Sequence, residues 1–574
     1  MNIFEHHLGE ITKIILSKKN ILKIDKIENL KGVNLEVPPE QFNFDLSCNI
    51  AMVLGKKNKI SPNILANKLK DIFLSEIKNF SEVEIAGPGF LNIKLSNQAL
   101  INNINLILKN NKNYGSSKKS ETYNIEFVSA NPTGPMHVGH CRGAIYGDVL
   151  ANLLKFNGYN VTKEYYINDY GNQIKNFVES VYLRISEIKN NKKFPLKENL
   201  YPGLYIKDIA EKIIKENINQ DFKDFDKNFE FLKKHSLNKS MEIIKQDLKL
   251  LGISHDNFFS ETEIVNKDLV SKAVKELKKK NLVEEGFLQP PKGEINKDWK
   301  KVKRLIFKST LFGDDTDRAL QKNDGSWTYF ANDVAYHMDK IDRKYENLIN
   351  ILGADHTGYI KRITAAVSAL SENKIKLNCK VCQLVKLYKN GEPYKMSKRA
   401  GDFISAQDLL NEVEKDQIRF MMLYRSNDVE LDFDFDKVKE KTKDNPVFYV
   451  QYAYARINSL FRTLNLSIPN EVNLESNNLN LNQMEEKIIR KVFEWPKIIE
   501  SSSRKFDLHK IPFYLYELST LFHAYWSKGN EDKKFRFIEN DQIKRKEILS
   551  IISLVAIVIQ NGMGILGVSL PKKM

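Results

Sequence analysis

The clearest alternation of apolar and polar positions begins at residue 123. There "YNIEFVS" reads as a strand, "ANPTGPM" as a turn and "HVGHCRGAIYGDVLANLLKFNG" as a helix. On that helix Ile145, Val149 and Leu153 form one stripe at i, i+4 and i+8, and Gly158 is placed to end it. The segment "NVTKEYYIND" follows as the next strand. A strand, helix and strand in this order predict a parallel sheet of the doubly wound type.

The same pattern returns further along the chain. In "NLINILGADHTGYIKRITAAVSAL" (347–370) a buried strand, a polar turn and a helix are expected, and another strand runs through Val385 and Tyr388 into an "NG" turn. Residues from about 175 to 325 are rich in lysine and helical in pattern. We therefore expect an insertion at about 175–325 that splits the nucleotide-binding fold.

The two ends of the chain differ from this middle part. The beginning combines amphipathic helical segments with a strand and glycine turn at 83–95, and it ends in the polar stretch "KNNKNYGSSKKS". From residue 444 helical spacing dominates, with Val450, Tyr454 and Ile457 on one stripe. The expected fold class is α/β: a split doubly wound Rossmann-type catalytic domain, a small α/β N-terminal domain and an all-α C-terminal helical bundle. The expected domains are an N-terminal domain at 1–115, a catalytic domain at 121–440 and a helical domain at 445–574.

Composition adds two expectations about partners and location. The net charge of +16 suits a polyanionic partner such as RNA, although lysine-rich composition alone would give the same balance. The N-terminus has no continuous apolar core, and the longest apolar run, "LVAIVI", is far short of the roughly 20 residues of a membrane span. We expect a soluble cytoplasmic protein that does not bind membranes.

The cysteines fit a reducing compartment better than a disulfide framework. There are four, Cys48, Cys141, Cys379 and Cys382, of which the last two form a C-x-x-C pair in a strand-like run. No second pair is present to complete a zinc site, so small buried residues are the favoured interpretation and no protein-bound metal is expected.

Candidate chemistry concentrates in the turn before the first helix, where "NPTGPMHVGH" carries His137 and His140. Four interpretations are open: a metal site, an acid/base pair, a phosphate-binding turn, or two histidines without function. A metal site is disfavoured because no further His or Cys lies nearby at ligand spacing. The N-terminus of a helix beyond a strand end is a natural phosphate site, and Gly134 and Gly139 let the backbone approach a ligand. Imidazoles there can stabilise charge on a phosphate undergoing substitution.

A second candidate group lies downstream, in "EPYKMSKRAGDFIS" (392–405). It places Lys395, Lys398 and Arg399 on a loop after another strand, which is expected to belong to the same parallel sheet, where mobile ammonium groups can neutralise a pyrophosphate leaving group. A solvated lysine-rich loop is the alternative.

Carboxylates near these motifs offer a receptor for a guanidinium, whose planar fork binds carboxylates through paired hydrogen bonds. Glu126 and Asn131 flank the end of the first strand, and "WTYFANDVAYHMDK" carries Tyr329 and Asp333 four residues apart, on one face if the segment is helical.

H-V-G-H followed by K-M-S-K resembles the two signatures of class I aminoacyl-tRNA synthetases. The longer segments "EFVSANPTGPMHVGHCRGAIYGD", "TYFANDVAYHMDK", "LGADHTGY", "DNPVFYVQYA" and "LGVSLPKKM" resemble the arginyl-tRNA synthetase family along almost the whole chain. The resemblance implies a ligase that forms arginyl-adenylate from arginine and ATP and transfers arginine to the 2′-hydroxyl of the terminal adenosine of tRNA(Arg).

The resemblance also implies roles for particular residues, a monomer, tRNA(Arg), L-arginine and ATP as partners, and Mg²⁺ accompanying ATP. It further implies that the domain at 1–115 binds the elbow of the tRNA and that the helical domain at 445–574 binds the anticodon. The signature region is Asn131, Pro132, Thr133, Gly134, Pro135, Met136, His137, Val138, Gly139, His140 and Cys141, with His137, His140, Lys395 and Lys398 as catalytic residues. Arginine would be held by Glu126, Ser129, Asn131, Tyr329 and Asp333, ATP by His137, Gly139, His140, Gly353, Asp355, His356 and Met396, and tRNA by Tyr449, Tyr452 and Met574. Tyr and Met on a bundle helix are equally well explained as core.

Two rival functions remain on the sequence alone. One is a class I synthetase for another amino acid, such as glutamine or cysteine, against which Glu126 and Asp333 argue. The other is a synthetase-like RNA-binding protein without catalysis, which would need none of the four catalytic candidates.

Overall fold

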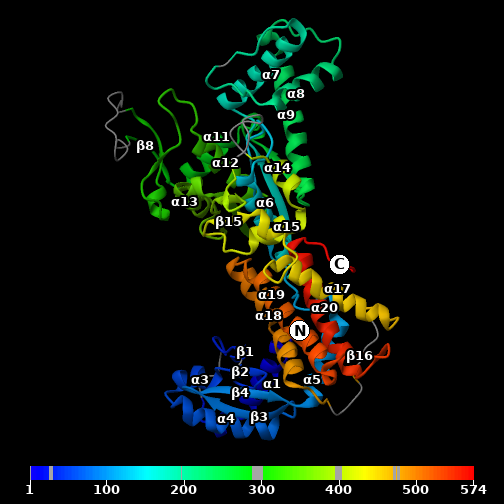
Figure 1. Cartoon of the computed structure of the whole chain (residues 1–574). Coiled ribbons are helices and arrows are strands. Elements are labelled where there is room, and N and C mark those ends of the chain that lie inside the picture. The colour runs from blue at the N-terminus through cyan, green and yellow to red at the C-terminus, as the bar shows by residue number, and fades with distance from the viewer. Residues whose placement is uncertain are drawn as a thin grey trace. The chain divides into compact units, whose positions relative to one another are not determined.

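A computed structural model describes residues 2–24, 30–39, 41–195, 197–287, 302–394, 404–468, 474 and 479–574. The chain forms two compact units (Figure 1). The terminal unit comprises Met1–Lys118 and Glu440–Met574, and the central unit comprises Lys119–Lys439.

An antiparallel sheet organises the first part of the terminal unit, drawn in blue in Figure 1. Its four strands have the order β1-β2-β4-β3, and the strand and glycine turn expected at 83–95 are the β3–β4 hairpin, in which Val83 lies opposite Ile93. Helices α3 and α4 pack against it. The elements are α1 (Ile3–Ser17), α2 (Lys19–Leu22), β1 (Leu35–Glu36), β2 (Leu46–Cys48), α3 (Ile50–Asn58), α4 (Pro62–Glu76), β3 (Phe80–Ala86), β4 (Phe90–Leu95), α5 (Asn97–Asn110) and the 3-10 turn η1 (Asn111–Asn113).

A helical bundle forms the other part of the terminal unit. Val450, Tyr454 and Ile457 are buried, as their spacing predicts. Helix α20 is apolar and long enough to cross a membrane by length and composition, which the short run "LVAIVI" did not suggest, but 89% of its most apolar stretch is buried in the fold. Its apolar character is therefore explained by a place in the bundle core. The elements are α17 (Pro446–Thr463), α18 (Gln483–Lys505), α19 (Lys510–Glu531), the 3-10 turn η4 (Lys533–Phe535), β16 (Ile538–Glu539), β17 (Gln542–Ile543) and α20 (Lys546–Leu566).

A parallel sheet of five strands organises the central unit, with the order β12-β11-β5-β6-β7. Ile145, Val149 and Leu153 are buried on α6, and Gly158 follows it with a φ of 89°. Between β5 and β11 the connections leave in opposite directions, which is where doubly wound sheets bind ligands at their carboxyl edge. The elements are β5 (Thr122–Glu126), α6 (Val138–Phe156), β6 (Asn160–Ile167), β7 (Asn257–Ser260), α12 (Tyr329–Asp342), β11 (Asn347–Gly353), the 3-10 turn η3 (Ala354–Tyr359), α13 (Ile360–Ser371) and β12 (Lys376–Cys382).

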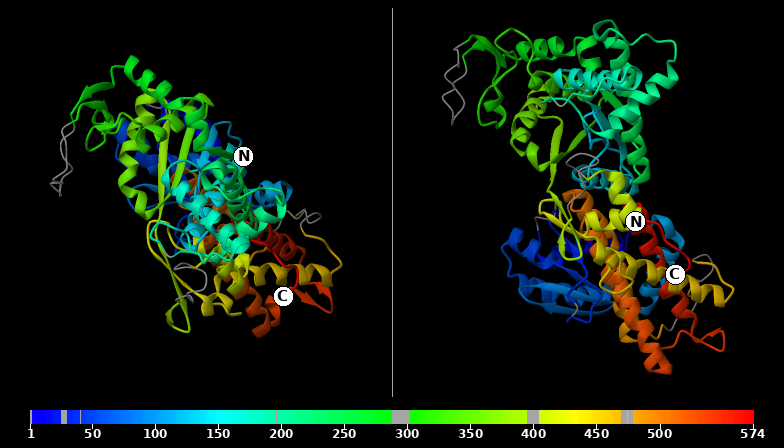
Figure 2. Two further views of the ribbon diagram at one scale, coloured as in Figure 1. Left: turned by 90° about the horizontal axis from the view of Figure 1, so that it is seen from above. Right: turned by 45° about the horizontal axis from the view of Figure 1, so that its top comes forward.

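The segment expected as a helical insertion at about 175–325 differs from that expectation. Helices α7, α8 and α9 pack side by side (Figure 2), but the chain then returns to the parallel sheet as β7 and later forms a separate antiparallel sheet, β10-β9-β8. Strands this short carry too few positions for period-2 alternation to stand out from helical spacing. The elements are α7 (Asn172–Asn190), α8 (Leu204–Glu216), α9 (Phe225–Leu250), α10 (Glu261–Asn266), α11 (Leu269–Lys279), β8 (Val283–Gly286), β9 (Arg304–Phe307), the 3-10 turn η2 (Ser309–Phe312) and β10 (Arg318–Ala319).

The strand through Val385 and Tyr388 is present, but it does not belong to the parallel sheet as the sequence suggested. It is β13, the middle strand of a small sheet with the order β14-β13-β15. Apolar spacing is alike in β12 and β13, so the sequence could not show that the chain leaves the first sheet after Cys382. The elements are β13 (Val385–Lys389), β14 (Glu392–Pro393), α14 (Ala406–Glu412), α15 (Lys415–Leu423), β15 (Leu431–Asp434) and α16 (Phe435–Lys439).

Candidate active site

The two signature histidines form a reciprocal cap at the start of α6. His137 is the N-cap residue, and its Nδ1 accepts a hydrogen bond from the Gly139 N–H (3.1 Å). His140 Nδ1 accepts one from the His137 N–H (3.3 Å), and the two rings stack with centroids 3.7 Å apart. Because both Nδ1 atoms are acceptors, the single proton of each neutral ring is on Nε2. The cap thus turns both imidazoles into Nε2–H donors.

Burial keeps these rings neutral. It lowers the pKa of His137, and it lowers the pKa of His140 to about 4, with the neighbouring His137 as the next cause. Asp355 acts on both rings in the opposite sense. Near neutral pH the pair therefore contributes hydrogen-bond donors rather than cations.

The residue before the pair, Met136, is held from two sides. Its N–H donates to Asp247 Oδ2 on α9 (3.0 Å), and its carbonyl accepts from the Ala406 N–H (2.8 Å). Val138 N–H also donates to the Ile404 carbonyl (2.8 Å). The exit of the lysine-bearing segment is therefore joined to the signature turn, whereas Lys395, Met396, Lys398 and Arg399 themselves lie outside the described residues.

Asp247 is a contributor that the sequence did not reveal. It is 5% exposed, and burial raises the pKa of its carboxyl to about 6. One acidic residue among several on a lysine-rich amphipathic helix gives no sign of its partner, because helical spacing indicates which face is buried and not what that face contacts.

Neighbouring side chains leave little space for a Cβ at the two signature glycines. A Cβ on Gly134 would lie 3.0 Å from the Tyr205 ring of α8, and one on Gly139 would lie 2.9 Å from the His137 ring. Their absent side chains therefore make room for protein groups that shape the turn.

The predicted arginine-binding residues lie at the end of β5, on the segment that follows it and on α12. Glu126 ends β5, where its Oε1 accepts from Ser129 Oγ (3.1 Å) and its Oε2 from Lys340 Nζ (2.6 Å). Tyr329 and Asp333 do lie four residues apart on a helix, α12. Tyr329 is 64% exposed at its first turn.

The Asp333 carboxyl is perturbed. Burial raises its pKa to about 7, and the charges of Glu126 and Glu261 act in the same sense, while a hydrogen bond from the Tyr359 hydroxyl opposes them. The influence of Glu126 on Asp333 shows that the structure brings these two predicted carboxylates together. A group that is costly to ionise in the empty site is a natural partner for an incoming cation.

Backbone strain marks the segment between β5 and the turn. Val128 and Ser129 have φ values of 73° and 40°, which is a costly conformation for a β-branched residue. Ser129 Oγ also accepts from the Tyr166 N–H (3.0 Å), and the Asn168 amide donates to Asn131 Oδ1 (3.2 Å). The strained turn thus places Ser129 against Glu126.

Of the predicted ATP-binding residues, Gly353 ends β11, the strand beside β5, and Asp355 and His356 follow it in η3. Asp355 and His356 are exposed, and Asp355 Oδ2 lies 3.3 Å from His356 Nε2. Because Asp355 influences both signature histidines, these residues share one edge of the sheet with His137 and His140.

The predicted tRNA-binding residues lie in the terminal unit. Arg456 donates to the Tyr452 hydroxyl (2.9 Å) and lies 5.4 Å from the Trp526 ring centroid, while Tyr449 packs against His523 at 4.2 Å. Met574 is 54% exposed. Arg456, His523 and Trp526 complete an aromatic and cationic cluster that the sequence did not predict, because helical spacing does not show which helices pack together.

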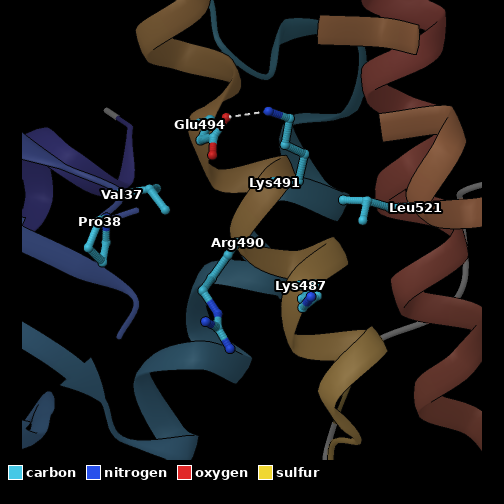
Figure 3. Close-up of a pocket in the computed structure, with 7 residues that line it drawn as sticks. All are labelled: Val37, Pro38, Lys487, Arg490, Lys491, Glu494 and Leu521. Carbon is cyan, nitrogen blue, oxygen red and sulfur yellow. Dashed lines mark hydrogen bonds and ion pairs between the residues drawn. The ribbon is translucent and has the colours of Figure 1, made fainter. Parts of the chain in front are cut away.

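A pocket in the terminal unit is unrelated to these motifs (Figure 3). Two of its cations pair with protein carboxylates: Lys491 lies 2.8 Å from both Glu494 and Glu517, and Arg490 lies 2.7 Å from Glu486. The pocket is lined by Val37, Pro38, Lys487, Arg490, Lys491, Glu494 and Leu521.

The C-x-x-C pair lies on β12, where Cys382 is buried and Cys379 is half-buried. Burial raises the pKa of both thiols, to about 12 and about 11, so neither is readily a thiolate ligand. Among the described residues, one group has the composition of a metal site, His6, His7 and Glu10 on α1. There His7 is already bonded to Glu10 (2.7 Å) and Asn103 (3.3 Å).

Three family models match the chain. They are described as "Arginyl tRNA synthetase N terminal domain" (residues 10–95), "tRNA synthetases class I (R), catalytic domain" (103–461) and "DALR anticodon binding domain" (450–574).

Individual proteins agree with the models. Arginine–tRNA ligases from Pelagibacter ubique (strain HTCC1062) and Wolbachia pipientis subsp. Culex pipiens (strain wPip) are 52% and 43% identical to the chain, each over 100% of both chains. A crystal structure of an arginyl-tRNA synthetase from Campylobacter jejuni is similar at 32% identity with a TM-score of 0.73, and covers 84% of this chain and 100% of its own. The Thermus thermophilus enzyme shares the fold, with a TM-score of 0.70 at 18% identity over 99% of this chain and 100% of its own.

The split parallel sheet with its capped histidine turn, together with the catalytic-domain match, defines a class I aminoacyl-tRNA synthetase. More specifically, the chain belongs to the arginyl-tRNA synthetase family, the arginine–tRNA ligases, enzymes that activate arginine with ATP and charge tRNA with it. This confirms the fold class, the family and the activity expected from the sequence.

Proposed function

We propose that arginine activation takes place at the carboxyl edge of the central sheet, between β5 and β11. The observation that carries this proposal is the reciprocal histidine cap, which leaves two neutral Nε2–H donors at a helix N-terminus. His137 and His140 donate to the phosphate oxygens of ATP and stabilise the charge that develops when the arginine carboxylate attacks the α-phosphate. Gly139, Gly353, Asp355 and His356 frame the nucleotide.

Asp333 and Glu126 hold the guanidinium of arginine, and Tyr329, Ser129 and Asn131 complete the pocket. The raised pKa of the Asp333 carboxyl supports this assignment, because a bound cation offsets the cost of ionising it. A neutral side chain, or a lysine that cannot bond in a planar fork, would leave a carboxylate uncompensated.

Lys395 and Lys398 neutralise the departing pyrophosphate, and Met396 contacts ATP. Two hydrogen bonds support this role: the Ala406 N–H donates to the Met136 carbonyl, and the Val138 N–H donates to the Ile404 carbonyl. They anchor residues 404–406 beside the histidines. Mg²⁺ accompanies ATP and neutralises charge on its phosphates, for which oxygen ligands suffice. No protein-bound metal is assigned.

The adenylate is then attacked by the 2′-hydroxyl of the terminal adenosine of tRNA(Arg), which takes up the arginyl group as AMP leaves. The domain at 121–440 carries this chemistry, while the domains at 1–115 and 445–574 bind the tRNA, with Tyr449, Tyr452 and Met574 among the contacts. The unit boundaries after Lys118 and Lys439 support this division. The enzyme works as a cytoplasmic monomer.

Attachment of labelled arginine to total tRNA, with and without ATP, tests the proposal, with lysine and glutamine as controls. Asp333→Ala should abolish arginine activation and leave tRNA affinity nearly intact. Asp342→Ala, at the exposed end of the same helix, is the matched control and should charge normally. Unchanged arginine turnover in Asp333→Ala would remove Asp333 from the site.

A further inference from the structure

A buried cation lies within the proposed arginine subsite. Lys340 is 0% exposed, and its Nζ lies 2.6 Å from Glu126 Oε2 and 3.3 Å from Asn350 Oδ1. It lies on α12 seven residues after Asp333 and three after His337, so the three share one face of the helix. A fully buried ammonium is costly unless it is paired and hydrogen-bonded, and these two contacts provide that.

Lys340 sets the orientation of a chain of hydrogen bonds. An ammonium only donates, so the Asn350 atom beside it is the carbonyl oxygen, and the Asn350 amide nitrogen faces His337 Nε2 at 3.0 Å. Burial lowers the pKa of His337 to about 3, so the ring is neutral and holds one proton. With Nε2 accepting from Asn350, that proton is on Nδ1, which donates to the Asp333 carbonyl (2.8 Å).

The chain therefore connects the two carboxylates of the subsite. It runs from the Glu126 side chain through Lys340, Asn350 and His337 to the backbone of Asp333, and joins β5, α12 and β11. Each donor and acceptor role along it follows from the single cation at Lys340.

We propose that Lys340 is a positioning residue for arginine binding, which holds Glu126 directly and fixes the turn of α12 that carries Asp333 through Asn350 and His337. This inference rests on the proposed function of Glu126 and Asp333 as guanidinium acceptors. Lys340 does not touch the substrate. It sets the separation and direction of the two groups that do.

Lys340→Met tests the proposal in the full-length enzyme by arginine-dependent ATP–pyrophosphate exchange in the presence of tRNA. We expect the arginine KM to rise at least about tenfold, because both carboxylates lose their fixed geometry. The ATP KM should change less than about twofold, since the histidine cap is untouched. An arginine KM within about twofold of the parent value in the folded variant would overturn the proposal.

Lys163→Met is the matched control. Lys163 is also buried in the central unit and lies 2.6 Å from Asp148, so its loss should lower the melting temperature without raising the arginine KM. An equal rise in the arginine KM of this control would show that the effect comes from general destabilisation, and it would overturn the role of Lys340.

If Lys340→Met does not fold, Asn350→Leu decides, because it breaks the chain and leaves the Glu126–Lys340 pair in place. A raised arginine KM in that variant supports the proposal, and an unchanged one overturns it. Asp333→Ala distinguishes the two levels of inference. If Asp333→Ala still activates arginine, the subsite itself is wrongly assigned; if it is inactive while Lys340→Met behaves like the parent enzyme, only the positioning role fails.

Discussion

Arginine binding should depend on pH through Asp333. The pKa of this carboxyl is raised from its ordinary 3.8 to about 7, first by burial and then by Glu126 and Glu261. In the proposed subsite only the ionised Asp333 carboxylate pairs fully with a guanidinium, so we expect arginine binding to require that Asp333 gives up its proton. Lowering the pH through 7 should therefore weaken binding, and raising it above 7 should add little.

The magnitude follows from that pKa. A competing protonation with a pKa near 7 raises the apparent arginine KM about tenfold at pH 6, and by only about a tenth at pH 8. The same linkage applies to folding. Because the folded-state pKa of Asp333 is raised, its contribution to the stability of the empty enzyme declines as the pH rises from about 4 through 7, and bound arginine relieves this cost.

The assay is steady-state aminoacylation at saturating ATP and tRNA between pH 6 and 8, with the arginine KM as the readout. Asp333→Asn is the control, since its amide does not titrate and its arginine KM should be high and flat. Arginine should also raise the melting temperature more at pH 8 than at pH 6. A flat arginine KM in the parent enzyme, or a slope that persists in Asp333→Asn, would refute the reasoning.

Four further outcomes are expected. Asp247→Leu should slow ATP–pyrophosphate exchange by about tenfold or more, because displacing the histidine turn by about 1 Å is costly. Asp247→Asn keeps an acceptor for the Met136 N–H and should stay near the parent rate. Equal rates for the two variants would contradict this prediction. Gly147→Ala, whose Cβ would lie 2.3 Å from the buried Phe127 ring, should lower the free energy of unfolding by about 1–3 kcal/mol in urea titrations. Gly143→Ala on the same helix should not destabilise the enzyme, because its Cβ would lie no closer than 3.9 Å to its nearest neighbour, Ile351. Tyr452→Ala should weaken tRNA binding by about tenfold if Tyr452 stacks on a base, and it should leave arginine activation unaffected. Phe513→Ala, at an exposed residue of the same bundle, should bind tRNA as the parent enzyme does. Binding of tRNA should weaken steeply with salt if many phosphates are contacted, and a shallow slope would assign the net charge to composition.

The sequence was most informative where a pattern is repeated over many residues. The stripe of Ile145, Val149 and Leu153 correctly predicted α6, and the strands on either side of it correctly predicted the parallel sheet. The four-residue strand β7 is too short to show an alternating pattern, so it was included in the predicted helical insertion. The membership of β13 in a second sheet was likewise hidden, because apolar spacing shows that a strand is buried without showing its neighbour.

The same limit applies to the site. His137, His140 and Asp333 could be selected because their residue types suit the proposed chemistry, and the structure adds their hydrogen-bond partners, which make both histidine Nδ1 atoms acceptors. Asp247 and Lys340 could not be selected, since their partners lie 111 and 214 residues away along the chain. Composition and periodicity do not show which residues far apart in the sequence contact one another.

Met136 limits how the enzyme's parts can be exchanged between relatives. Its N–H is bonded to Asp247 at the end of α9 and its carbonyl to the N–H of Ala406, so only its own two torsion angles lie between those anchors. A chimera that takes α9 from another enzyme must bring an acceptor for that N–H. Without one, a buried donor is left unpaired at a cost of about 1–3 kcal/mol, and the resulting shift falls on the residue next to His137. The helical segment and the lysine-bearing segment are therefore one exchangeable piece, although they lie far apart in the sequence.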